Sequence, residues 1–88
     1  MPDEVMLKRI NEIISTTKKD LKHYSSVGLS TDHDLEVMET ELNTLIDLRI
    51  RGYISSPEVD ELIYKITDLL ERKYTYLEEV ASLGNNWW

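Results

Sequence analysis

Long stretches without a helix breaker are the feature of this sequence that most constrains its fold. The 88 residues contain only three glycines and two prolines, and both prolines stand near the start of a segment. Glycine and proline interrupt helices more strongly than other residues, so the stretches between them are free to form long helices. A chain of this length forms one small domain at most. We therefore expect a single all-α domain.

The first stretch has the periodicity of an amphipathic helix. Its apolar residues recur at alternating spacings of three and four between Leu7 and Tyr24, which predicts a helix over about 4–25. Ser25, Ser26 and Gly28 then interrupt the pattern, because short hydroxyl side chains compete for backbone groups and glycine accepts a positive φ. These residues predict a loop.

Two further helices follow, each with a recognisable start. Thr31 or Asp32 supplies the N-cap of a second helix over about 32–51, and Gly52 supplies the left-handed residue that closes it. Ser56 is an N-cap residue, and Pro57 has the fixed φ of a first helical position. These two residues predict a third helix over about 57–82, followed by a tail at 84–88.

The third helix carries two overlapping apolar seams, so we expect it to contact two neighbours. The pattern fits either an antiparallel helical hairpin or a three-helix bundle with coiled-coil-like seams. This helix is longer than the second and should project past it. Its projecting part either packs on the first helix of its own chain or joins copies into a homo-oligomer, for which a dimer is favoured. The seam residues are Leu62, Ile66, Leu69, Leu70, Leu77 and Val80.

Charge and composition narrow the range of partners. The chain has 17 acidic and 10 basic residues and a net charge of −7, which repels nucleic acid and anionic lipid. A nucleic-acid binder would have to rely on Lys18, Lys19 and Lys22 against this charge. There is no cysteine, which is simplest for a cytoplasmic protein. The sequence shows neither a secretion signal nor the roughly 18 consecutive apolar residues of a membrane span.

No residue pattern indicates catalysis or metal binding. His23 follows three lysines and His33 lies between two aspartates, so both are expected on the solvated surface, and neither has a ligand partner at helical spacing. Neighbouring acidic residues on a helix point in divergent directions and stay hydrated. We expect no metal and no cofactor.

Contacts with another protein are predicted at two places. The acidic side of the third helix can complement a basic partner, such as a DNA-binding protein, or serve solubility alone. The terminal Trp87 and Trp88 either fold back on the bundle or anchor in a partner's pocket. The acidic candidates are Asp60, Glu61, Asp68 and Glu71.

Residues 35–74 also carry a family resemblance. They are laid out as helix, turn and helix, with the second arm opened by Ser56-Pro57-Glu58-Val59, Leu62 and Leu69 on its seam and Tyr74 near its end. This layout resembles the Spo-zero-E-like sporulation phosphatases of endospore-forming bacteria. The resemblance implies a phosphatase that acts on phosphorylated response regulators. The family's Ser-Gln-Glu-Leu-Asp signature falls on Ile63-Tyr64-Lys65-Ile66-Thr67, which keeps only the apolar fourth position.

The residues together predict a non-enzymatic protein–protein interaction module. It would act as an adaptor, assembly factor or inhibitor of the kind common among small bacterial or viral proteins, and it would self-associate. The alternative is a divergent phosphatase of phosphorylated response regulators.

Overall fold

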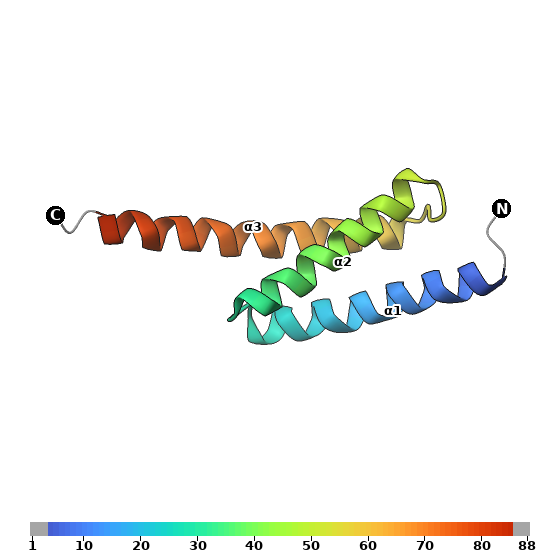
Figure 1. Cartoon of the computed structure of the whole chain (residues 1–88), viewed down its shortest axis with the longest axis horizontal. Coiled ribbons are helices and arrows are strands. Elements are labelled where there is room, and N and C mark those ends of the chain that lie inside the picture. The colour runs from blue at the N-terminus through green and yellow to red at the C-terminus, as the bar shows by residue number, and fades with distance from the viewer. Residues whose placement is uncertain (1–3, 86–88) are drawn as a thin grey trace.

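The computed structural model describes residues 4–85 and confirms the all-α fold (Figure 1). It contains α1 (Glu4–Val27), α2 (Asp32–Ile50) and α3 (Pro57–Asn85). The helices α1 and α3 run in the same direction, and α2 runs back from the end of α1 to the start of α3 (Figure 1). Each helix contacts the other two. Of the two predicted architectures, the chain therefore adopts the three-helix bundle.

The helix boundaries differ from the predicted ones by a few residues. The first helix continues to Val27, because serine is only mildly unfavourable in a helix and the first strong breaker is Gly28. The third continues to Asn85, because a single glycine at position 84 costs only about 1 kcal/mol relative to alanine. The predicted tail at 84–88 is therefore helical at its first two positions, and α2 ends at Ile50 as predicted to within one residue.

Thr31 caps α2 through a reciprocal pair of hydrogen bonds. Its Oγ1 accepts a bond from the Asp34 backbone N–H at 3.1 Å, and the Asp34 carboxylate accepts one from the Thr31 backbone N–H at 3.3 Å. This capping box satisfies two backbone donors that a helix start leaves without an internal partner. These bonds identify Thr31, rather than Asp32, as the N-cap of α2. The preceding helix, α1, is followed by Gly28, which has a φ of +83°.

Replacing Thr31 with alanine should lower the free energy of unfolding by about 1 kcal/mol, because the Asp34 backbone N–H loses its bond to Thr31 Oγ1. For a domain of this size that corresponds to a fall in Tm of about 4–8 °C, which a circular-dichroism melt resolves. Thr40→Ala is the matched control, since Thr40 is exposed within α2. Equal Tm values for the two variants would rule out the capping role.

The α2–α3 corner is closed by hydrogen bonds at both helix ends. Gly52 has a φ of +80°, its N–H donates to the Arg49 carbonyl at 3.0 Å, and the Tyr53 N–H donates to the Leu48 carbonyl at 3.0 Å. This is the pattern of a Schellman motif. On the other side, Ser56 Oγ accepts a bond from the Val59 N–H at 3.2 Å. The predicted roles of Gly52 and Ser56 are confirmed.

The core lies where the three helices overlap. Met38 and Leu45 from α2 and Ile66 from α3 are completely buried, and Thr17 of α1 is buried beside them. Each large apolar side chain removed from water stabilises the fold by roughly 1.5–3 kcal/mol. None of the described helices is both long and apolar enough to cross a membrane. The other buried apolar residues are Ile10, Leu21, Leu29, Leu35, Ile54, Val59, Leu62 and Leu70.

The C-terminal half of α3 projects beyond the bundle (Figure 1). The molecule measures 60 × 23 × 20 Å, and its long dimension follows this helix. Over residues 57–83 of α3, Leu70 is the last buried one, and every later residue in that range is exposed except the half-buried Lys73. The predicted projection is therefore present, and α1 packs within its own chain.

Candidate functional site

The projecting half of α3 continues the apolar seam of the core into solvent. Leu62, Ile66 and Leu70 are buried in the bundle, and Leu69 is half-buried against it. The next seam residues are exposed. Their exposed fractions are 57% for Tyr76, 41% for Leu77, 47% for Val80 and 65% for Leu83. We call these four residues the projecting face.

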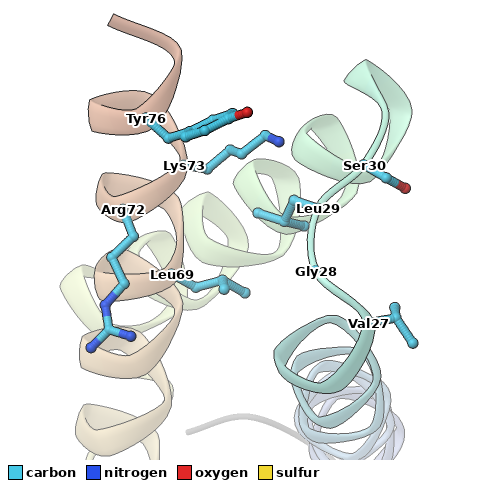
Figure 2. Close-up of a pocket in the computed structure, with 8 residues that line it drawn as sticks. All are labelled: Val27, Gly28, Leu29, Ser30, Leu69, Arg72, Lys73 and Tyr76. Carbon is cyan, nitrogen blue, oxygen red and sulfur yellow. The ribbon is translucent and has the colours of Figure 1, made fainter. Parts of the chain in front are cut away.

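A pocket of about 420 Å³ lies at the base of this face, between α3 and the α1–α2 loop. Figure 2 shows Leu29 and Leu69 pointing toward each other across the gap, with Tyr76 and Lys73 extending from α3 on the same side. Arg72 lies along α3 at the edge. We call this hollow the loop pocket; its lining residues are Val27, Gly28, Leu29, Ser30, Leu69, Arg72, Lys73 and Tyr76.

The loop pocket combines an apolar floor with positive charge. Lys73 Nζ lies 5.3 Å from the centroid of the Tyr76 ring, within range of a cation–π contact. Arg72 pairs with Asp68 at 3.1 Å on the exposed side of the helix. None of the described residues that line the pocket is acidic. Such a hollow suits the side of an amphipathic helix that carries apolar and acidic residues.

The four acidic residues predicted as partner contacts all lie on α3. Asp68 is half-buried, and the others are exposed. All of them except Glu71 form an ion pair with a basic residue of the same chain. Asp60 pairs with Arg49, Glu61 with Lys65 at 2.9 Å and Asp68 with Arg72. The hydrogen bond and charge of Lys65 lower the pKa of Glu61. Much of the acidic charge on this side is therefore balanced within the chain, and its role in partner binding stays a prediction. Trp87 and Trp88 lie outside the described residues.

A pair of carboxyl groups between α1 and α2 was missed by the sequence reasoning. Burial and a hydrogen bond to Asp20 raise the pKa of Glu41 to about 8. Two carboxylates share a hydrogen bond only if one of them carries a proton. Glu41 Oε2 is buried and has no hydrogen-bond partner among the described residues, which disfavours a negative charge on this carboxyl group. At neutral pH, Glu41 is the protonated partner.

The spacing of these two acids gave a weak signal. Asp20 is three residues after the buried Thr17, and Glu41 is three residues after the buried Met38, so each lies on the inward side of its helix. Within residues 4–85 no three His, Asp or Glu side chains gather closely enough to hold a metal ion. The pair can therefore store a proton, and it offers no described ligand set for a metal.

The segment that aligns with the phosphatase signature is partly structural. Ile66 is completely buried, and the Thr67 hydroxyl donates to the Ile63 carbonyl at 2.7 Å. Tyr64 is exposed and lines a shallow hollow beside Ser25 of α1. The family resemblance stays a prediction. No protein-family model, curated protein or solved structure matches this chain.

Proposed function

We propose that this chain is a non-enzymatic protein–protein interaction module that binds a helix of a partner protein along the projecting face. The carrying observation is the exposure of Tyr76, Leu77, Val80 and Leu83 on a helix whose seam is buried at Leu70 and Ile66, about two and three turns before Leu77. Contiguous apolar surface of this kind marks interaction sites more often than chance placement.

The energetics support this use of the helix. Covering a large apolar side chain contributes roughly 1.5–3 kcal/mol, so several such residues offset the ordering cost of binding a partner helix. The seam is held in helical form by the bundle at its base, which reduces the cost of presenting it. Tyrosine is favoured at binding hot spots, and Tyr76 lies at the junction of the projecting face and the loop pocket.

The acidic residues and the terminal tryptophans add to this proposal. Glu71 is exposed on the projecting half, and it forms no ion pair with the described residues. Its negative charge is therefore not balanced within the described part of the chain, unlike the charges of Asp60, Glu61 and Asp68. Trp87 and Trp88 follow α3 in the sequence and would extend its apolar contact area. A cytoplasmic location remains part of the proposal.

Site-specific photo-crosslinking in the native cell tests this function. A photoreactive phenylalanine analogue in place of Tyr76 should give a discrete crosslinked protein species, because Tyr76 lies within the proposed interface. The same analogue in place of Tyr64 is the matched control, since Tyr64 is an exposed tyrosine on α3 that lies outside the projecting face. We expect adducts at position 76 and few or none at position 64.

Equal crosslinking at both positions would show that the projecting face has no preference, and absence of adducts at position 76 would overturn the proposal. A circular-dichroism melt of each substituted protein confirms that the bundle is intact before the adducts are compared.

A further inference from the structure

Lys73 occupies a position of α3 that the helical repeat otherwise gives to apolar or aromatic residues. Alternating steps of four and three along the helix pass through Leu62, Ile66, Leu69, Lys73, Tyr76, Val80 and Leu83. Lys73 is the one charged member of this stripe, and its side chain is half-buried. It stands where the buried part of the stripe ends and the projecting face begins.

The charge of Lys73 has no counter-charge within residues 4–85. The neighbouring cations Lys65 and Arg72 each pair with an acidic residue on α3, whereas none of the described ion pairs includes Lys73. Its Nζ lies 5.3 Å from the centroid of the Tyr76 ring, and the described lining of the loop pocket has no acidic residue. In the isolated chain the ammonium group can remain hydrated. A partner that covers the projecting face removes that water.

We infer that the partner helix presents a carboxylate to Lys73 from within its own apolar stripe. This inference rests on the proposed function and states the chemistry of the partner. Burying an ammonium group without a counter-charge costs more than burying an apolar side chain gains, so a wholly apolar partner stripe is disfavoured. An aspartate or glutamate opposite Lys73 replaces that cost with a charge-assisted hydrogen bond.

The same lysine disfavours a second copy of this chain as the occupant. The projecting positions of the stripe are Lys73, Tyr76, Val80 and Leu83, and none of them is acidic. Two copies paired along this stripe would bring no carboxylate from one stripe to the lysine of the other, and a parallel pair in register would place both lysines together. A single charged residue in an apolar seam selects its partner in this way. The face therefore fits a helix of a different protein.

The loop pocket beside Lys73 has room for the apolar part of the contact. Leu29 and Leu69 form its floor and point toward each other across a hollow of about 420 Å³ (Figure 2). Gly28 lines this pocket and has no atom within 4 Å of the position where a side chain would begin, so the wall there is not crowded. A large apolar side chain of the partner can enter the pocket while a carboxylate next to it on the same helix face meets Lys73.

Two substitutions of Lys73 test the counter-charge in the photo-crosslinking experiment at position 76. Lys73→Met removes the charge and keeps an unbranched side chain of similar helix propensity. If the partner stripe were wholly apolar, this change would keep or raise the yield of adducts. With a carboxylate opposite position 73, the carboxylate loses its partner, so we expect the yield to fall about tenfold or more.

Lys73→Glu places two negative charges together and should abolish the adducts. Lys8→Glu is its matched control, because it makes the same change in net charge at an exposed position of α1 outside the loop pocket, and it should leave the yield unchanged. Circular-dichroism melts confirm that the bundle is intact in each variant.

A charge exchange with the partner completes the test. Mass spectrometry of the adduct locates the crosslinked residue of the partner. We expect an aspartate or glutamate within about two helical turns of that residue, because positions 73 and 76 are themselves about one turn apart. Replacing this acidic residue with lysine should restore the adducts of the Lys73→Glu variant, since opposite charges face each other again.

The outcomes separate this inference from the proposed function. Adducts that persist at the native yield in Lys73→Met and Lys73→Glu would overturn the counter-charge and leave the interaction function standing. A crosslinked segment without an acidic residue, or an adduct made only of this chain, would do the same. Absence of adducts at position 76 in the chain with its native Lys73 would overturn both proposals.

Discussion

Leu70→Asp should leave the chain unfolded, whereas Leu77→Asp should leave it folded. The two leucines lie seven residues apart on one seam of α3, but Leu70 is 6% exposed within the bundle and Leu77 is 41% exposed beyond it. Placing a carboxylate at a buried apolar position costs several kcal/mol, and small domains have only about 5–15 kcal/mol of total stability. At an exposed position, a substitution usually changes stability by no more than about 0.5 kcal/mol.

Circular dichroism and photo-crosslinking separate the two effects. Leu70→Asp should lose its helical signal at room temperature. Leu77→Asp should keep the native melt and should lose the adducts at position 76, because Leu77 lies on the projecting face and outside the core. A native-like melt of Leu70→Asp would contradict its assignment to the core. Unfolding of Leu77→Asp in the monomer would show that the projecting half belongs to the folded unit.

The stability of the bundle should fall as the pH rises from about 5 to about 8. Glu41 has a folded pKa of about 8, above its ordinary value of 4.5, so the folded state binds more protons than the unfolded state between these limits. The stabilising contribution is therefore fully present below pH 4.5 and is lost as the pH passes through 8. A loss of about 1 kcal/mol would lower Tm by about 4–8 °C.

Glu41→Gln isolates this contribution. The amide of glutamine donates to Asp20 without titrating, so the variant should be less dependent on pH and more stable than the native chain at pH 8. Other titratable groups lie around Glu41, namely Arg9, Glu12, Tyr24, His33 and Glu36, and their contributions cancel in the comparison. Glu71→Gln is the control on an exposed site. Parallel pH profiles for native and Glu41→Gln proteins would refute the buried proton.

The sequence was informative about helices because their ends depend on local chemistry. Thr31, Gly52, Ser56 and Pro57 act through hydrogen bonds and φ angles within a few residues of themselves, so their roles followed from residue type. The two seams of α3 likewise followed from spacing alone. The pairing of Glu61 with Lys65 follows from spacing as well, because residues four apart on a helix are neighbours.

What the sequence did not reveal depends on distances between helices. Leu70 and Leu77 occupy equivalent places in the repeat, and only the reach of the α1–α2 corner along α3 makes one buried and the other exposed. Asp20 and Glu41 are likewise ordinary acidic residues until α1 and α2 pack against each other. Three-dimensional packing therefore decides where the core ends and where a proton is held.

The projection of α3 also gives one continuous helix two different local stabilities. Backbone hydrogen bonds before Leu70 are protected by the core and open only when the bundle unfolds, whereas those in the projecting turns open by local fraying. A short helical segment without tertiary contacts is only marginally stable in water, so the outer turns keep their form through their connection to the bundle. The part of α3 that packs in the bundle therefore stabilises the helical form of the projecting part.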